Sequence, residues 1–281
     1  MNNFSINRFG KTLRWVVSVD FRSLMMWTIG YSIAVFLGEM LFFYLSNDRT
    51  TEQIISYIVQ FCSIFIVIAL GVIFSTAFAG LNKRPRREAF LMLPATNLEK
   101  YLSVLAYVTI VWTVCVFLSI AVGDTLRMIV RSVVYGDPWV SGILPLLKSF
   151  IPGFGDTFFI KHTLAYKVMN ITVASAFVVW LHSLYILGGT LLRRYAFVVA
   201  SVIFVLCMMS LSWLIYHYQM PMFSSSWVGD HYEYQEVGTL AYVLAVVLPL
   251  LSVFNYWASF RIFKGFQLIT NKWTNYDFFK R

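Results

Sequence analysis

The chain has 281 residues, of which 59% are hydrophobic and only 12% are charged. Soluble domains are about 45–50% apolar and about 25% charged, so this composition excludes an ordinary soluble domain and is typical of a membrane protein. The net charge of +9 does not indicate nucleic-acid binding, because a basic patch needs a solvated surface. We therefore expect an all-α integral membrane protein and attribute the basic charge to its topology.

The first predicted element is an amphipathic helix over residues 5–22. Apolar side chains recur at spacings of three and four from Ile6 to Leu24, while Arg8, Lys11 and Arg22 fall mostly on the opposite side. This pattern predicts a helix lying in the inner membrane interface. The alternative is a basic flank that only sets topology. We expect no cleavable signal, because the apolar run that follows is too long and lacks a small-residue cleavage pattern.

Six apolar runs are long enough to cross a bilayer, whose core takes about 20 helical residues. Residues 143–159 form a shorter apolar stretch, which Pro145 and Pro152 interrupt, and this stretch is expected to lie on the membrane or dip into it. The predicted spans are 24–45, 54–80, 101–123, 164–189, 196–216 and 237–260.

The distribution of Lys and Arg predicts that both termini are cytoplasmic. With the N-terminus inside, 16 of the 22 basic residues fall in cytoplasmic segments, where the positive-inside rule places them. The longest external segment is then 124–163, and the whole chain forms one membrane-spanning domain, 1–281. The soluble segments are too short to be separate domains.

The loop between the second and third spans has two helix signals. Pro85 suits the first turn of a helix and Pro94 cannot continue one, so residues 86–92 are predicted to form about two turns. Thr96 and Glu99 match a capping box that starts the third span near Asn97. This short amphipathic helix is typical of a docking element; the alternative is a surface turn whose charges only enforce topology.

At this loop the chain resembles the membrane-spanning permease subunit of the type-2 family of ATP-binding-cassette exporters. The resemblance rests on the basic stretch 5–22, the order of the spans, and the segment 88–100, which is similar to the family's leucine-proline, Ser/Thr and Glu- or Lys-bearing helix start. It implies a permease of the bacterial cytoplasmic (inner) membrane. Its partners would be a separate cytoplasmic ATPase, which binds the ATP, and a second permease in a homodimer or heterodimer.

The resemblance also implies two contacts with the ATPase. The helix 86–92 would dock in a cleft of the ATPase, and Arg193 and Arg194, in the tight loop between spans four and five, would make a second contact. One departure concerns the external side, since the family usually carries its main elaboration between spans five and six rather than at 124–163. The residues that would dock through the coupling helix are Arg86, Arg87, Glu88, Phe90, Leu91 and Met92.

Sequence motifs for catalysis or metal binding are not found. The segment most similar to a phosphate-binding loop is Gly10-Lys11-Thr12. The first glycine of that motif would fall on Ser5, and no strand precedes the segment. The four histidines lack metal-ligand spacing, and the three cysteines lie in separate apolar runs. We therefore expect no catalytic residue, no metal and no cofactor in this chain, and do not expect it to be an enzyme.

Four polar residues interrupt the spans and form a possible intramembrane site: Glu39, Asn170, His182 and Asn255. A carboxylate inside a span is costly, so a functional role is the default for Glu39; an interfacial acid paired with a base is the alternative. The other three are expected to hydrogen-bond between helices or to line a polar path, and packing is favoured. Gly71, Ser75 and Ala79 form a small-residue ridge that lets another helix approach.

Two other functions compete with export. One is a stand-alone membrane scaffold or sensor, which needs neither an ATPase nor a polar path. The other is an intramembrane enzyme, for which Glu39 and His182 are the only candidate groups. The sequence does not choose among drugs, peptides, lipids and glycans as a substrate, because aromatic-rich spans serve all of them.

Overall fold

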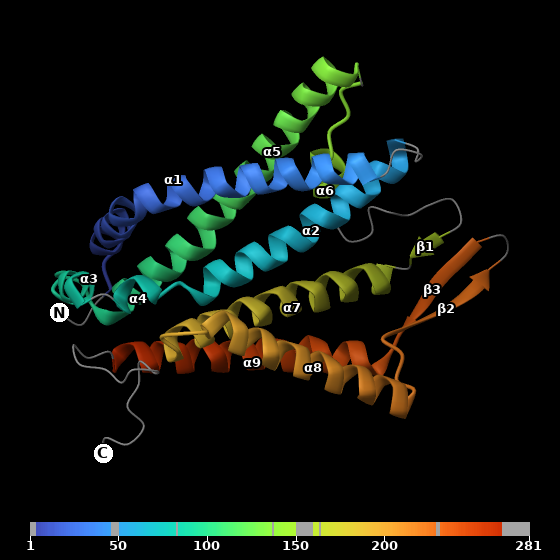
Figure 1. Ribbon diagram of the computed structural model, residues 1–281. Helices are drawn as coiled ribbons and strands as arrows, with labels where there is room; N and C mark the ends of the chain where they lie inside the picture. Colours follow the sequence, from blue (N-terminus) through green and yellow to red (C-terminus); the bar gives the residue numbers. More distant parts are fainter. Residues whose placement is uncertain are drawn as a thin grey trace. The chain divides into compact units, whose positions relative to one another are not determined.

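A computed structural model describes residues 4–45, 51–82, 84–136, 138–149, 160–162, 164–228 and 231–265 (Figure 1). Helices dominate this part of the chain, which confirms the all-α class. Six of the described helices are long and apolar enough to cross a membrane, as expected for a multi-pass membrane protein. The chain divides into two compact units, residues 1–73 with 93–150 and residues 74–92 with 151–281.

Unit 1 is built around the packing of the first helix against the third membrane-crossing helix. The contact is close at Gly123, where an added Cβ would lie 2.8 Å from the Cβ of the buried Val35. The helices of unit 1 are α1 (Ile6–Leu45), most of α2 (Thr51–Ser75), α4 (Asn97–Ala106), the π-helical turn η2 (Tyr107–Val111), α5 (Trp112–Tyr135) and α6 (Ile143–Ser149).

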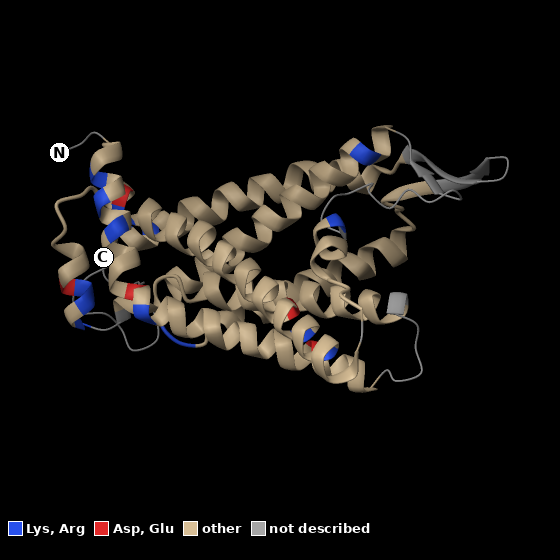
Figure 2. Ribbon diagram, turned by 90° about the horizontal axis from the view of Figure 1, so that it is seen from above, with Lys and Arg blue, Asp and Glu red and all other residues tan. Residues whose placement is uncertain are grey.

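The predicted interfacial helix and the first span form one continuous helix, α1, and are not separate elements. Residues 22–24 contain neither proline nor glycine, so nothing in the sequence stops the helix between them. The ribbon nevertheless changes direction within its first turns, as Figures 1 and 2 both show. The N-terminal turns of α1 therefore run across the direction of its longer, apolar part, as an interfacial segment would.

The third crossing helix begins where the capping box predicted it. Thr96 is the N-cap of α4, its hydroxyl accepts from the Glu99 backbone, and the Glu99 side chain accepts from the Thr96 backbone. The helix continues through η2 and α5 to Tyr135, and Gly136 ends it in a left-handed conformation with φ 71°. Residues 124–135, which we assigned to an external segment, are therefore helical.

Unit 2 has α7 and α9 side by side as its centre (Figure 1). Ala176, Trp180 and Leu248 form its core, and Phe204 of α8 packs on them. The helix bounds agree within a few residues with the last three predicted spans. The helices of unit 2 are η1 (Ala79–Asn82), α3 (Arg84–Leu91), α7 (Leu164–Leu191), α8 (Ala196–Tyr218) and α9 (Thr239–Lys264).

A small three-stranded sheet in unit 2 was not predicted. It has the order β1-β3-β2, with β2 (Phe223–Val228) antiparallel to β3 (His231–Val237) and β1 (Ile160–His162) parallel to β3. The residues of β3 alternate aromatic and polar types from Tyr232 to Gln235, which is a strand pattern. These short strands are a local addition to an architecture that is otherwise helical in the described residues.

The neighbour of the small-residue ridge is α7 of the same chain. An added Cβ at Gly189 would lie 2.4 Å from the carbonyl oxygen of Ser75, so only glycine allows this approach. The contact at Ser75 is thus explained within unit 2 and needs no second copy of the chain.

Candidate functional site

The helix α3 is anchored to unit 2 by one face. Phe90 is 1% exposed, and its ring packs against Phe263 of α9 at 6.3 Å between centroids. Arg87, one turn earlier, is 3% exposed, and its Nε donates to the carbonyl of Leu81 at 2.7 Å. Burial lowers the pKa of Arg87, and the nearby charge of Arg193 lowers it further. The side chains at positions 87 and 90 therefore serve to hold α3 in place.

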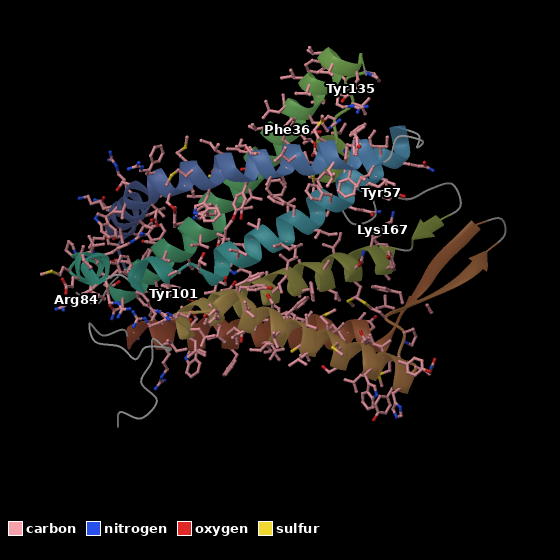
Figure 3. The ribbon with its side chains drawn as sticks, viewed as in Figure 1. Phe36, Tyr57, Arg84, Tyr101, Tyr135 and Lys167 are labelled. Carbon is pink, nitrogen blue, oxygen red and sulfur yellow. The ribbon has the colours of Figure 1, made fainter. Side chains whose placement is uncertain are left out.

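The opposite face of α3 is open. Arg84 and Glu88 form an exposed ion pair at 2.8 Å, and Arg84 points away from the helix (Figure 3). Met92, directly after the helix, is 85% exposed. A short helix lies in the predicted loop, at Arg84–Leu91 rather than 86–92, but the expectation that it displays Phe90 is wrong, because Phe263, far away in the sequence, covers that ring.

The other residues predicted to contact the ATPase are half-buried on α3 or lie in the connection between α7 and α8. Arg86 and Leu91 are half-buried, and the Arg86 guanidinium lies so close to Gly80 that an added Cβ there would be 2.7 Å from its Cζ. Arg194 is exposed in the connection between α7 and α8, whereas Arg193 is half-buried within Coulombic range of Arg87. The two predicted ATPase contacts therefore lie at the same end of unit 2.

A second set of polar contacts joins the start of α1 to the start of α4 in unit 1. The buried Glu99 carboxylate accepts from Arg8, at 2.9 Å to Nη2, and from the backbone of Ser5 at 2.7 Å and of Thr96 at 2.8 Å. These bonds lower the pKa of Glu99 to about 2, the Arg8 hydrogen bond contributing most. We call this set the inner ion pair, after the side of the membrane that the sequence predicts for it. Figure 2 places most Lys and Arg of α1 along its first turns.

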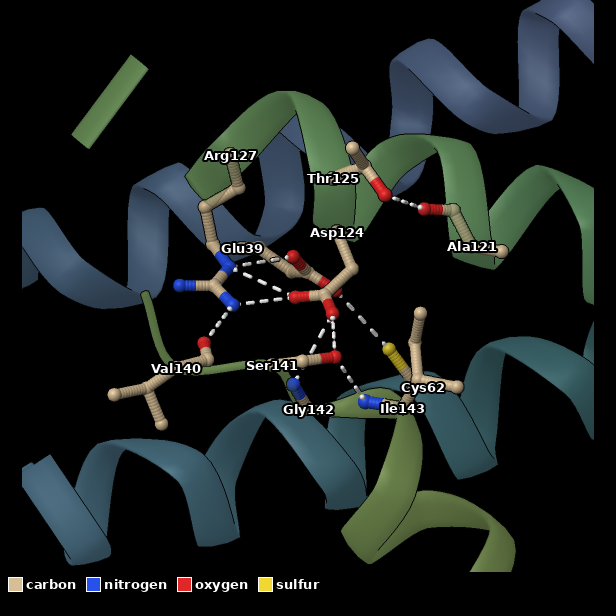
Figure 4. Close-up of polar contacts among 10 residues, drawn as sticks. All are labelled: Glu39, Cys62, Ala121, Asp124, Thr125, Arg127, Val140, Ser141, Gly142 and Ile143. Carbon is tan, nitrogen blue, oxygen red and sulfur yellow. Dashed lines mark hydrogen bonds and ion pairs between the residues drawn. The ribbon is translucent and has the colours of Figure 1, made fainter. Parts of the chain in front are cut away.

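A third set surrounds Glu39, which was expected to be either functional or paired with a base. The base is Arg127 of α5, whose Nε donates to Glu39 Oε2 at 2.9 Å. Asp124, one turn earlier on α5, also accepts from Arg127 through its Oδ1. Glu39 is 0%, Asp124 1% and Arg127 3% exposed. We call Glu39, Asp124 and Arg127 the outer cluster, after the side of the membrane that the sequence predicts for it (Figure 4).

The outer cluster extends to the segment that leads into α6. Arg127 Nη2 donates to the carbonyl of Val140 at 2.8 Å. Asp124 Oδ2 accepts from the hydroxyl of Ser141 at 2.6 Å and from the backbone of Gly142 at 3.1 Å. The Cys62 thiol of α2 lies 3.4 Å from Glu39 Oε1. One buried cation and two carboxylates thus connect three helices with residues 140–142.

Sequence reasoning found Glu39 but missed its partners. Asp124 and Arg127 were placed in an external loop, because the apolar run ends at Gly123. The available signal was helical spacing: Asp124 and Arg127 are three positions apart, and no proline or glycine follows before Gly136. Extending the predicted helix to Gly136, where its stop signal lies, would have placed Asp124 and Arg127 on α5.

The polar residues of unit 2 form a seam between α7 and α9. Asn255 donates to Ser183 at 3.1 Å, and His182 Nδ1 lies 2.5 Å from the Tyr256 hydroxyl. The hydroxyls of Thr190 and Ser259 are 3.1 Å apart. These hydrogen bonds agree with the expectation that His182 and Asn255 serve helix packing. Asn170 is half-buried on α7, about 18 Å along the helix from His182, and does not belong to this seam.

No group of three or more His, Cys, Asp or Glu residues in the described ranges could hold a metal ion. Of the four histidines in the sequence, His162 lies in the strand β1 and His231 in the strand β3. Comparison of the chain with known protein families, with curated proteins and with solved structures gave no match. The geometry of the sites therefore carries the functional argument.

Proposed function

We propose that this chain is the permease subunit of an ATP-driven exporter in the bacterial inner membrane, with both termini cytoplasmic. The observation that carries the proposal is the form of α3. It is a short helix between two membrane-crossing helices, held by Phe90 and Arg87 and open along Arg84, Glu88 and Met92. A helix fixed on one face and free on the other is suited to receive a partner and to pass on its motion.

The partner that fits this surface is a cytoplasmic ATPase of the ATP-binding-cassette type. Arg84 and Glu88 offer both signs of charge at the rim, and Met92 offers a flexible apolar contact of the kind that adapts to a groove. Arg194 supplies the second contact from the α7–α8 connection. Phe90 transmits rather than docks, because its ring rests on Phe263 at the end of α9. A second permease completes the transport path.

Co-purification tests the proposal. The chain is tagged and isolated from membranes of cells that also express the ATPase encoded beside it, and bound ATPase and ATP hydrolysis are measured. The double variant Arg84→Glu/Met92→Glu should lose most of the bound ATPase, because it reverses the rim charge and places a second charge in the apolar contact. Arg14→Glu, a charge reversal at another exposed arginine, on α1, is the matched control.

Three outcomes would count against export. The chain could bind no ATPase, the double variant could bind as well as the unaltered chain, or the control could lose binding equally. Absence of a bound ATPase would favour a stand-alone scaffold or sensor, whereas the other two outcomes would remove α3 as the docking site. The intramembrane-enzyme alternative has less support, because Glu39 is engaged by Arg127 and His182 by Tyr256, and each contact accounts for its residue without chemistry.

A further inference from the structure

The segment 140–149 lies on unit 1 with few apolar anchors. Leu146 is 2% exposed, but Leu144 and Leu147 on the same short helix are 61% and 47% exposed. Gly142 lies against α2, where an added Cβ would be 2.9 Å from Ile58 Cγ2. A segment whose apolar side chains are so little buried within the protein is held to it mainly by its polar contacts.

The outer cluster supplies these polar contacts. Three hydrogen bonds reach the segment from α5: Arg127 to Val140, Ser141 to Asp124, and Gly142 to Asp124. The Ser141 hydroxyl also accepts from the backbone of Ile143 at the start of α6. Hydrogen bonds to charged groups are stronger than those between neutral groups. The position of α6 on unit 1 therefore depends on Asp124 and Arg127.

Glu39 fixes the orientation of this anchor. Its carboxylate binds Arg127 Nε, which leaves Nη2 directed at the Val140 carbonyl. On its other side Glu39 accepts from Cys62, which is 2% exposed. The thiol of Cys62 therefore lies directly behind the cluster, on α2.

We propose that Glu39, Asp124 and Arg127 form a latch that seats residues 140–149 on α1, α2 and α5, and that release of this segment opens Cys62 to water. The three are positioning residues. The latch stands on the contacts within unit 1 alone. Its further use as the outer gate of the permease rests on the proposed function.

Thiol labelling tests the latch. The full chain, with Cys115 and Cys207 replaced by alanine, is placed in lipid nanodiscs, which expose both membrane faces, and a membrane-impermeant maleimide is added. Cys62 should react slowly. In Ser141→Ala, which removes one bond to Asp124, the reaction should be roughly tenfold faster, since labelling follows the open population. Asp124→Asn, which weakens all the bonds to that carboxylate, should accelerate it further.

A second reporter separates release of the latch from general unfolding. Ser103 is 0% exposed beside the inner ion pair, and Ser103→Cys is made in a chain without the natural cysteines. This thiol should stay protected in Ser141→Ala and Asp124→Asn. The proposal is overturned if Cys62 labels equally in all variants, if it is already open in the unaltered chain, or if both reporters accelerate in parallel.

A further arm separates the latch from the proposed function. In nanodiscs that contain the ATPase, ATP should accelerate labelling of Cys62 if the segment serves as a gate. If Ser141→Ala opens Cys62 but ATP has no effect, the latch stands and the gate role fails. If neither change opens Cys62, the latch itself is wrong, whatever the ATPase does.

Discussion

The first helix is tied to the third membrane-crossing helix by two ion pairs of different construction. At the inner ion pair the carboxylate of Glu99 receives one arginine and two backbone N–H groups, and the side chain of Arg8 is 29% exposed. At the outer cluster one arginine, whose side chain is 4% exposed, serves two carboxylates. Water can replace the carboxylate as a partner of Arg8 at the first site but cannot replace a partner of Arg127 at the second, so the two ends of α1 should respond differently to the loss of a carboxylate.

The largest expected effect is Arg127→Met. It leaves Glu39 and Asp124 buried beside each other without a cation, and breaking a buried ion pair costs about 3–5 kcal/mol. The free energy of unfolding, measured by denaturant titration in mixed detergent micelles, should fall by this amount. The triple variant Glu39→Gln/Asp124→Asn/Arg127→Met should recover much of it, because no buried charge remains.

The control for this change is Arg14→Met on the exposed side of α1, which should leave stability nearly unchanged. If Arg14→Met and Arg127→Met lower the free energy of unfolding equally, the outer cluster makes no particular contribution to the stability of unit 1. If the triple variant is no better than Arg127→Met, the loss is due to packing of the long arginine side chain rather than to charge.

Glu99→Gln should destabilise the protein less than Arg127→Met, because Arg8 keeps its access to water. It should also change the dependence on pH. The pKa of Glu99 is lowered to about 2 from an ordinary value of 4.5, so its contribution is complete above about pH 4.5 and is lost as the pH falls through about 2. Thermal unfolding of the original chain should therefore weaken more between pH 5 and pH 2 than that of Glu99→Gln. Equal slopes would contradict the assignment.

Thr96→Ala removes the N-cap of α4 but leaves Arg8 and Glu99 paired. Loss of such a cap costs about 1 kcal/mol, and the unfolding titration used for Arg127 should detect it. Thr125→Ala is the matched control, because that exposed hydroxyl bonds only to the Ala121 carbonyl of its own helix (Figure 4). An equal loss in Thr96→Ala and Thr125→Ala would show that the cap adds no stability of its own.

The smallest expected effect is Ser103→Ala. Its hydroxyl bonds mainly to the Glu99 carbonyl at 2.7 Å within its own helix and lies 3.4 Å from the Phe9 carbonyl of α1. Hydrogen bonds between helices in membranes average about 0.6 kcal/mol, so the unfolding free energy should change by no more than that. A loss as large as that of Glu99→Gln would place the main attachment of α1 at Ser103 instead.

The two ends of α1 also differ in how far the sequence predicts them. Thr96 and Glu99 are three positions apart, so their capping box is local and was predicted, and α4 begins at Asn97 as expected. Arg8 is 91 positions from Glu99, and no local pattern predicts that pairing. At the outer cluster, hydropathy ended the span at Gly123 and so hid Asp124 and Arg127, although helix spacing pointed to them.

Contacts between distant segments account for the other differences. Phe90 was expected on the outside of its helix, but burial depends on Phe263, which is far away in the sequence. The parallel pairing of β1 with β3 likewise joins residues about 70 positions apart. Proline positions, apolar runs and caps are local features, and they predicted the six long helices and α3 well.

The π-helical turn at Tyr107–Val111 determines whether both ends of α1 can be held by one helix. Ser103, beside the inner ion pair, and Ser119, whose hydroxyl donates to the Thr28 carbonyl of α1, are sixteen positions apart. In a regular α-helix they would point about 160° apart; one inserted residue, as in a π-bulge, reduces this to about 60°. Deleting one residue from this turn would leave the two serines fifteen positions apart in a regular α-helix, at the same angle of about 60°, and should therefore keep Asp124 and Arg127 facing Glu39. The π-helical turn thus absorbs one extra residue and preserves the phase between the two attachments.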